Sequence, residues 1–206
     1  MPQVSVQDWV DKITSGQYLG SFPTDTVPAL ASRPDAAHLI YEAKQRSQTK
    51  PLILMGASIA DLMPYVQGSP SEAEVWQRVM NQYFPGALTL VLPASDRLPR
   101  SMNPLDPTTI GIRVPDRAIA RYLLAQTGPL ATTSANRSGE PALQTQTEIE
   151  AAFPEVFTLP LDVIRQIEQT PETTDTPASS GIPSTVAKWT GQDWYILRQG
   201  AVTVSS

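Results

Sequence analysis

Short apolar runs of strand length alternate with helical patterns along most of this 206-residue chain, and this alternation limits the fold more than any other feature. Apolar side chains at positions 6, 9, 10 and 13 recur at the spacing of one helix face. Residues 51–55 instead form a continuous apolar run, which is typical of a buried strand. Such units pack helices against a sheet. We therefore predict an α/β fold in which a twisted mixed sheet is flanked by helices.

The boundaries of the elements follow from caps, turns and periodicity. Helices are predicted over residues 6–14, 34–43, 58–63, 69–84, 116–125 and 148–152, with Asp116 as the cap of the fifth. Strands are predicted over residues 18–23, 51–55, 87–92, 109–114 and 129–133, followed by a hairpin of residues 185–189 and 194–197. Residues 169–183 are rich in Thr, Pro and Ser, which predicts a mobile loop. No repeat or boundary interrupts the pattern, so we expect a single domain over residues 1–206.

Composition excludes several classes of site. Without cysteine there is no disulfide, thiol nucleophile or zinc–thiolate centre. The single histidine, His38, excludes a histidine-rich metal centre, and no G-x-S-x-G elbow accompanies it. The sequence also lacks the G-x-x-x-x-G-K-[ST] and G-x-G-x-x-G phosphate motifs. A nucleotide would therefore have to be bound by a site that uses neither of these motifs.

Charge and hydropathy bear on partners and compartment. The formal net charge of −5 argues against a surface that is basic throughout, as nucleic-acid-binding proteins often have, although a local basic cleft would fit. The N-terminal residues include Asp8 and Asp11 and no long apolar run, so we expect neither a signal peptide nor a membrane span. We expect a cytoplasmic protein that does not bind membranes.

Three cations lie close together where a predicted helix gives way to a strand. The segment reads Lys44-Gln-Arg46-Ser-Gln-Thr-Lys50-Pro51. Cations at this position complement the helix dipole, which is one interpretation. The other interpretation is an anion clamp, in which Arg46 offers a planar fork to phosphate or carboxylate and the two lysines act as point charges. The segment alone does not decide between them.

Small polar residues follow the strand predicted over residues 129–133. They form the segment Thr132-Thr-Ser134-Ala-Asn136-Arg-Ser-Gly139. The carboxyl ends of strands are where open α/β sheets tend to bind ligands, so these hydroxyl and amide groups suit a polar ligand. An ordinary turn stabilised by the same side chains is the alternative.

Further candidates are individually weak. Thr26 lies in Pro23-Thr-Asp-Thr-Val27, Ser184 precedes the last hairpin, and Arg198 follows it. Arg113 lies on an otherwise apolar strand, where it is either buried with a partner or exposed at the strand end.

Taken together and in this order, these segments resemble the YrdC-like threonylcarbamoyl-AMP synthases. That family shows P-T-E-[TA]-V, K-x-R-(x)3-[NK]-P-L-I, P-G-x-[LV]-T, T-[VI]-x-[VI]-R-x-P, S-x-N-x-S-G, [EP]-S-T-[VI] and R-x-G. The matching segments here begin at residues 23, 44, 85, 109, 134, 183 and 198. The resemblance extends over nearly the whole chain.

The resemblance implies a single YrdC-like domain with a positively charged cavity. The activity it implies joins L-threonine, bicarbonate and ATP into threonylcarbamoyl-AMP and pyrophosphate, with Mg²⁺ on the ATP and no metal site in the protein. Partner proteins would then transfer the threonylcarbamoyl group to tRNA, and tRNA or double-stranded RNA is a further expected ligand. The implied catalytic residues are Lys44, Arg46 and Lys50. The implied ATP ligands are Arg46, Lys50, Thr109, Ser134, Asn136 and Arg198, and the implied threonine ligands are Thr26, Arg113, Thr132 and Ser184.

Three departures from the family pattern leave an alternative open. Residues 27–31 read Val-Pro-Ala-Leu-Ala where the family has an aromatic residue and glycines, and Pro28 removes an amide donor. Met55 replaces a frequent histidine, and Ala142 replaces a frequent serine. The alternative is a divergent paralogue, non-catalytic or of different specificity, that binds nucleotide or structured RNA.

Overall fold

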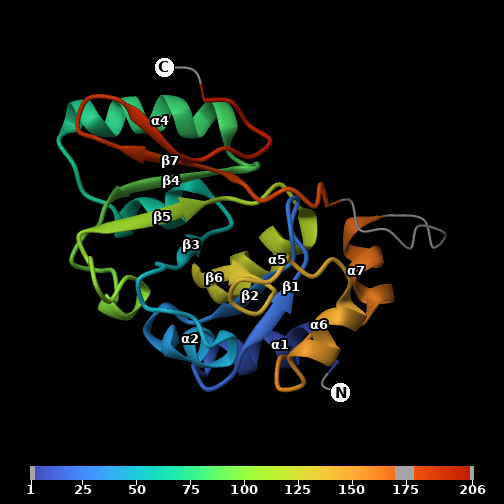
Figure 1. Ribbon diagram of the computed structural model, residues 1–206. Coiled ribbons are helices and arrows are strands. Elements are labelled where there is room, and N and C mark those ends of the chain that lie inside the picture. The colour runs from blue at the N-terminus through green and yellow to red at the C-terminus, as the bar shows by residue number, and fades with distance from the viewer. Residues whose placement is uncertain (1–2, 170–178, 205–206) are drawn as a thin grey trace.

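The computed structural model describes residues 3–169 and 179–204, and these residues build a mixed eight-stranded sheet (Figure 1). The strands lie in the order β1-β2-β6-β3-β5-β4-β7-β8. Neighbours are antiparallel except for the parallel pairs β3–β5 and β4–β7. The bounds are β1 (Gly20–Phe22), β2 (Ala29–Ser32), β3 (Ile53–Met55), β4 (Leu88–Pro93), β5 (Thr109–Arg113), β6 (Leu130–Ser134), β7 (Thr185–Trp189) and β8 (Trp194–Arg198).

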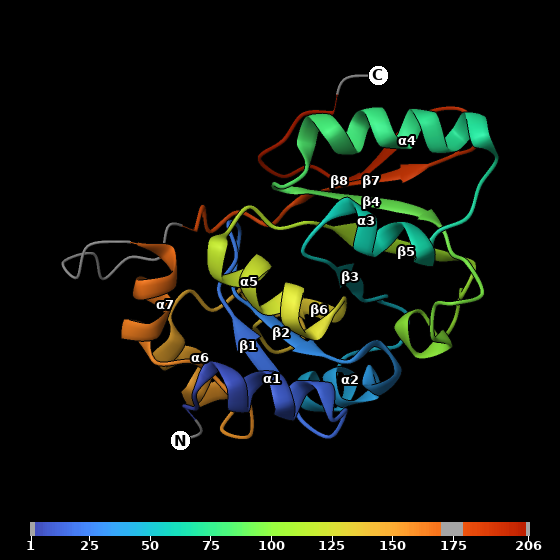
Figure 2. The same ribbon diagram turned by 180° about the vertical axis from the view of Figure 1, so that it is seen from behind.

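Helices cover the two halves of the sheet unequally. In Figures 1 and 2, α4 lies over the β4–β7 half, whereas α1, α2 and α5 lie around β1, β2 and β6. The helices are α1 (Val6–Thr14), α2 (His38–Lys44), α3 (Ile59–Leu62), α4 (Pro70–Tyr83), α5 (Ala118–Thr127), α6 (Gln146–Ala152) and α7 (Leu161–Glu168), with 3₁₀ turns at η1 (Pro34–Ala36), η2 (Met63–Tyr65) and η3 (Arg100–Met102). None of the helices in residues 3–169 and 179–204 is long and apolar enough to cross a membrane.

Local sequence explains why the helices begin where they do. Helix α4 begins with a capping box, because the Ser69 side chain accepts a hydrogen bond from the Glu72 amide and the Glu72 side chain accepts one from the Ser69 amide. Pro70 occupies its first turn, where no amide donor is needed. Helix α1 begins after Ser5, whose side chain accepts a hydrogen bond from the Asp8 amide.

The larger core lies between α2, α3, α4 and one face of the sheet. Successive strand residues point to opposite faces, so alternate positions enter this core. Leu54, Leu90 and Ile112 do so from three neighbouring strands, and Trp76 and Met80 of α4 pack in the same core. The residues between them in each strand therefore face the other side of the sheet.

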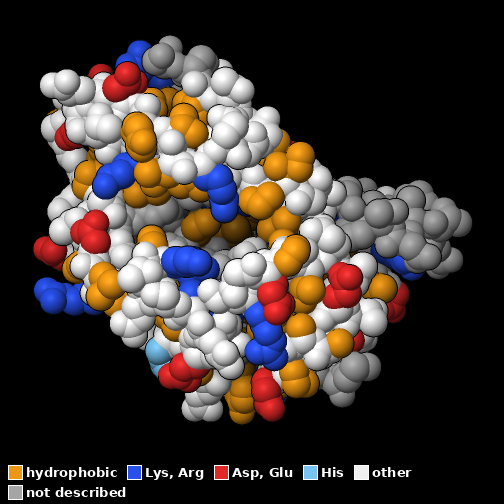
Figure 3. Space-filling view, in the orientation of Figure 1, with side chains coloured by type: hydrophobic (Ala, Val, Ile, Leu, Met, Phe, Trp, Pro, Cys, Tyr) orange, Lys and Arg blue, Asp and Glu red, His pale blue; other side chains and the backbone are white. Residues whose placement is uncertain are grey.

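The opposite face is only partly covered. Ala29, Met55 and Leu130 pack there with Trp9 of α1 and Leu123 of α5. Among the described residues, β4, β5 and β7 contribute nothing to this second core. This second core therefore stops short of β5, and Figure 3 shows a hollow in the surface in this region.

Most predicted elements are present, and two were missed. Helix α1 has the predicted bounds, and the predicted strands and final hairpin appear within a few residues. Strand β2 was not predicted, and neither was helix α7. The prediction that Asp116 caps α5 is wrong: Arg117 occupies the cap position, without a side-chain capping bond. Most of the predicted mobile loop, residues 170–178, lies outside the described residues.

Candidate functional site

A cavity of about 360 Å³ occupies the open part of the sheet face. This volume is large enough for a small-molecule ligand. Apolar side chains form part of its wall, among them Val27, Pro28, Ala29, Ile53 and Met55. Three arginines and one glutamate are the charged residues in the lining, so the cavity carries an excess of positive charge. Figure 3 shows blue Lys and Arg side chains beside the hollow and orange apolar groups within it.

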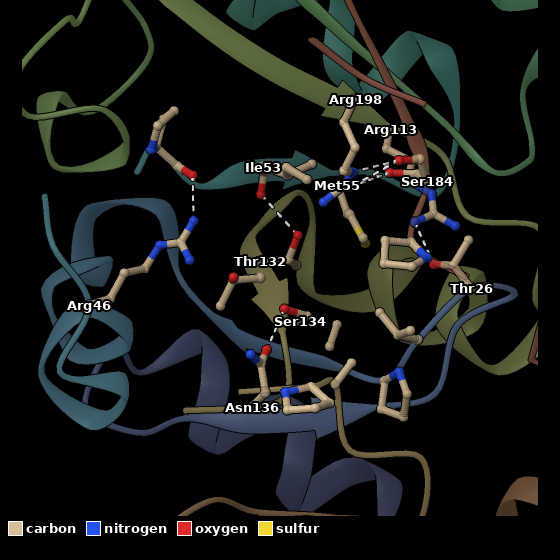
Figure 4. A pocket seen from close by; sticks show the side chains of 18 of the residues that line it. Thr26, Arg46, Ile53, Met55, Arg113, Thr132, Ser134, Asn136, Ser184 and Arg198 are labelled. Carbon is tan, nitrogen blue, oxygen red and sulfur yellow. Dashed lines mark hydrogen bonds between the residues drawn. The ribbon is translucent and has the colours of Figure 1, made fainter. Parts of the chain in front are cut away.

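Arg46 defines one end of the cavity. Helix α2 ends at Lys44, and Gln45 turns the chain with a left-handed backbone (φ 49°). Arg46 then donates from Nε to the Lys50 carbonyl oxygen (3.0 Å) and from Nη2 to the Pro51 carbonyl oxygen (3.1 Å). Partial burial lowers the pKa of this guanidinium from its ordinary value. The fork is thus held in place at the rim, where Figure 4 shows it across from Ser134 and Asn136.

Lys44 is buried beneath the turn that follows β6. Its ammonium donates to the Ser134 carbonyl oxygen and to Asn136 Oδ1 (3.1 Å for the latter). Asn136 in turn accepts from Ser134 Oγ (2.5 Å) and donates to the Glu140 carbonyl oxygen (2.6 Å). Burial, reinforced by the charges of Arg46 and Lys50, lowers the pKa of Lys44 to about 7. Lys44 therefore supports the turn that presents Ser134 and Asn136 to the cavity.

Arg113 lies at the opposite end and is almost fully buried. Its guanidinium donates to the Gly86 carbonyl oxygen (3.0 Å), Thr26 Oγ1 (2.8 Å) and Asp25 Oδ1 (2.7 Å). Burial lowers its pKa despite the Asp25 carboxylate, which acts in the opposite direction. The alternative that Arg113 is exposed at a strand end is thus wrong. Its charged partner, Asp25, is a residue that the sequence prediction did not single out.

Ser184 and Arg198 complete this end of the cavity. The Arg198 Nε and Nη2 atoms donate to the Ser184 carbonyl oxygen (3.0 and 2.8 Å). The Ser184 hydroxyl lies 2.8 Å from Thr89 Oγ1, a residue of β4. Gly200 allows this arrangement, because a Cβ there would stand 2.5 Å from the Thr185 amide nitrogen. The R-x-G segment thus has a packing reason for its glycine.

The structure brings together most of the predicted site residues. Eight of the eleven line the cavity: Thr26, Arg46, Arg113, Thr132, Ser134, Asn136, Ser184 and Arg198 (Figure 4). Lys44, Lys50 and Thr109 are not among its lining residues. Thr132 also bonds within the sheet, donating to the Ile53 carbonyl oxygen (3.0 Å). The individual ligand roles remain predictions.

The three departures from the family pattern lie in the cavity wall. Pro28, Met55 and Ala142 all line it. Pro28 keeps a structural contact through its carbonyl oxygen, which accepts from the Ala135 amide (2.8 Å). Among the described residues no group of three His, Cys, Asp or Glu side chains could hold a metal ion.

Comparison with known proteins agrees with the motif pattern. A family model for the Sua5/YciO/YrdC domain, described as "Telomere recombination", matches residues 12–200. The chain belongs to this family. Among curated members, a threonylcarbamoyl-AMP synthase of Vibrio cholerae is 37% identical over 150 residues, which cover 70% of this chain and 78% of that protein. The threonylcarbamoyl-AMP synthase of Bacillus subtilis is 41% identical over 128 residues, which cover 59% of this chain and 36% of that protein.

Solved structures of the family share the fold. Sua5 of P. abyssi, described as complexed with L-threonine, superposes with a TM-score of 0.77 at 30% identity. That match covers 95% of this chain and 54% of the Sua5 chain. The chain spans 36–47% of the length of the first curated family members it matches.

Proposed function

We propose that this family member is an L-threonylcarbamoyladenylate synthase, which makes threonylcarbamoyl-AMP and pyrophosphate from L-threonine, bicarbonate and ATP. The observation that carries the proposal is the cavity with Arg46 at one end and Arg113 and Arg198 at the other (Figure 4). The carboxylate of an amino acid and the phosphates of ATP are both anionic groups, and arginines in one cavity can bind both. The curated relatives named threonylcarbamoyl-AMP synthase support it.

Threonine would occupy the Arg113 end. Three atoms of the Arg113 guanidinium are already fixed by protein acceptors, so the group is preorganised. An arginine held in this way offers its remaining N–H groups to a carboxylate without reordering. Thr26 and Ser184 place hydroxyl groups beside it for the polar atoms of the amino acid. Met55 and Ile53 supply apolar wall for the side-chain methyl group.

ATP would occupy the Arg46 end and reach toward Arg198. The Arg46 fork suits phosphate oxygens, and the Ser134–Asn136 turn offers hydroxyl and amide groups to the nucleotide. Arg198 lies against Ser184, so a group assigned to ATP and a group assigned to threonine meet there. The reacting atoms would therefore come together near these two residues.

The reaction needs no side-chain nucleophile. The threonine amine adds to bicarbonate carbon and water leaves, which gives a carbamate. A carbamate oxygen then attacks the α-phosphorus of ATP, and the bond to the bridging oxygen breaks to release pyrophosphate. Negative charge develops on phosphate oxygens during this step, and fixed arginines stabilise it electrostatically. Arg46 and Arg198, which both line the cavity, would do so.

Magnesium would enter as the counterion of ATP. The described residues offer no cluster of carboxylates for a dedicated site, and Glu140 is the one acidic side chain in the cavity lining. Mg²⁺ commonly binds through substrate phosphates and water rather than an all-protein cage. This part of the proposal predicts that the ion binds only with nucleotide.

The product would be consumed by proteins that transfer the threonylcarbamoyl group to a tRNA adenosine. An acyl-adenylate is an activated donor, so an acceptor amine on the base can displace AMP. The proposal places the chain in a compartment that holds both ATP and tRNA, which we take to be the cytoplasm. Direct binding of tRNA or double-stranded RNA is a further part of this proposal. In the alternative, the chain is a divergent paralogue that binds nucleotide or structured RNA.

Product analysis tests the proposal. Purified protein incubated with Mg–ATP, L-threonine and bicarbonate should release pyrophosphate only when all substrates are present, and chromatography should resolve an acyl-adenylate. The Vibrio cholerae relative is the positive control, and Arg46→Ala should lose most of the signal. Protein that binds ATP equally well with and without threonine, and forms no product beside an active control, would favour the paralogue.

A further inference from the structure

Arg117 is a buried arginine that does not line the cavity. It stands immediately before α5, with 7% of its surface exposed. Its Nε and Nη2 atoms form a bidentate ion pair with Oε1 and Oε2 of Glu168, the last residue of α7 (2.6 and 3.0 Å). Its Nη1 atom donates to the Thr24 carbonyl oxygen (3.2 Å). The guanidinium thus joins α7 to the loop that carries Thr26.

That loop is a directed chain of hydrogen bonds leading to the cavity. Thr24 donates its only hydroxyl hydrogen to the Val27 carbonyl oxygen (2.7 Å). In the 3.1 Å contact between the Thr24 and Thr26 hydroxyls, Thr26 must therefore be the donor. Thr26 Oγ1 also accepts from Arg113 Nη1 (2.8 Å), so its hydroxyl has a defined orientation. A shift of Thr24 would be transmitted directly to Thr26 and Arg113.

The residue before Arg117 contacts the same loop. The Asp116 amide donates to Asp25 Oδ1 (3.1 Å), the same oxygen that accepts from Arg113 Nη2 (2.7 Å). Residues 116 and 117 therefore hold two consecutive loop residues. Asp116 binds the carboxylate of Asp25, and Arg117 binds the carbonyl oxygen of Thr24. On its other side, the loop is held by the Ser180 amide, which donates to the Asp25 carbonyl oxygen (3.0 Å).

The charge and shape of Arg117 suit this task better than a lysine would. A buried ion pair contributes little net stability compared with apolar packing, so its value here lies in geometry. A guanidinium can bond two carboxylate oxygens and a carbonyl at fixed angles at once, which a single ammonium cannot reproduce. Glu168 fixes the plane of the fork, and that plane directs Nη1 at Thr24.

We propose that Arg117, oriented by Glu168, is a positioning residue that holds the Thr24–Thr26 loop so that Thr26 keeps the guanidinium of Arg113 aimed at the carboxylate of L-threonine. The inference rests on the proposed function for the identity of that ligand. It assigns Arg117 to the threonine end of the cavity alone. The Arg46 end belongs to different segments, and within residues 3–169 and 179–204 none of the hydrogen bonds of Arg117 reaches it.

Threonine binding separates this role from a purely structural one. Calorimetric titration of L-threonine should give a Kd raised about five- to tenfold in Arg117→Met, the effect of roughly one misaligned hydrogen bond. Arg117→Lys and Glu168→Gln should show smaller increases in the same direction. In steady-state assays the KM for threonine should rise accordingly, while the KM for ATP stays within about twofold of wild type.

A second, more exposed arginine provides a control. Arg33 also pairs with a carboxylate, that of Asp35, and donates to a carbonyl oxygen, that of Thr14 (3.0 Å), but it does not line the cavity or bond to the 24–26 loop. Arg33→Met should leave both KM values unchanged. Thermal unfolding of every variant shows whether it folds, and if Arg117→Met does not, the Lys and Gln variants carry the test.

The possible outcomes are distinguishable. Arg117 variants that unfold at lower temperature yet bind threonine like wild type, or that lose ATP and threonine affinity equally, would overturn the inference. Wild-type protein that binds threonine but forms no acyl-adenylate would overturn the proposed function alone. Wild-type protein that does not bind threonine at all would overturn both.

Discussion

Lys44 should make the stability of the fold depend on pH in a way that one substitution removes. Only 1% of this residue is exposed, and burial lowers the pKa of its ammonium from 10.5 to about 7. Above pH 7 the folded protein therefore binds fewer protons at this site than the unfolded protein, which stays protonated until about pH 10.5. Stability should consequently rise with pH across this window.

The size of the effect follows from the two pKa values. One pKa unit corresponds to about 1.4 kcal/mol, so the full difference is on the order of 5 kcal/mol between acidic and strongly alkaline pH. Between pH 7 and 9 the folded lysine loses most of its proton, and the free energy of unfolding should rise by about 2 kcal/mol. Below pH 7, Lys44 is charged in both the folded and the unfolded protein, so the full cost of burying its charge lowers the free energy of unfolding.

Urea unfolding of wild type and Lys44→Met at pH 7, 8 and 9 measures this contribution. Other titrating groups are common to both proteins, so the difference between the two pH slopes isolates Lys44. Wild type should gain about 2 kcal/mol relative to the variant over this range. Parallel pH profiles for the two proteins would show that Lys44 keeps an ordinary pKa and would refute the reasoning.

Four further predictions concern the site. ATP phosphates placed near Lys44 should raise its pKa, so the protein should take up protons when it binds ATP near pH 8. Calorimetry in two buffers of different ionisation enthalpy detects this uptake, and equal heats of ATP binding in the two buffers would contradict it. Arg46→Ala should raise the KM for ATP at least tenfold, with Arg46→Lys recovering only part of it in the same assay. Asp25→Asn leaves the buried Arg113 without its counter-charge, so the free energy of unfolding measured in urea titrations should fall by about 2–3 kcal/mol. An unchanged free energy would mean that water, or a rearrangement of the substrate-free protein, compensates for the lost carboxylate. Gly200→Ala forces a Cβ against the backbone of Thr185, and a thermal scan should show a loss of about 2 kcal/mol, whereas a neutral result would mean that the last segment shifts freely.

Local patterns predicted the elements that carry strong local signals. The capping box at Ser69 and Glu72 and the apolar spacing of α1 were readable without tertiary context. Strand β2 was missed because residues 29–32 read Ala-Leu-Ala-Ser, without the β-branched and aromatic residues that are typical of strands. They also directly follow Pro28. The pairing of β2 with β1 and β6 makes it a strand, and that pairing is non-local.

The site was predictable as a set of segments but not as a network. The motifs identified most of the residues that line the cavity, because each motif marks a strand end or turn that reaches it. The sequence did not show that Lys44 turns inward to Ser134, since that depends on how α2 packs beside β6. Likewise, the ion pair of Arg113 with Asp25 joins residues that are 88 positions apart in the chain, and no local pattern encodes it.

The chain order of the cavity walls bears on how the protein matures during synthesis. Thr26 is synthesised well before Ser184 and Arg198. Strand β7 pairs in parallel with β4, and such long-range pairing forms slowly. A nascent chain that has formed β1 to β6 therefore has Arg46 and Arg113 but lacks Ser184 and Arg198, which complete the Arg113 end of the cavity. Ligand binding should accordingly appear only after residues 184–198 have been synthesised and have paired with the sheet.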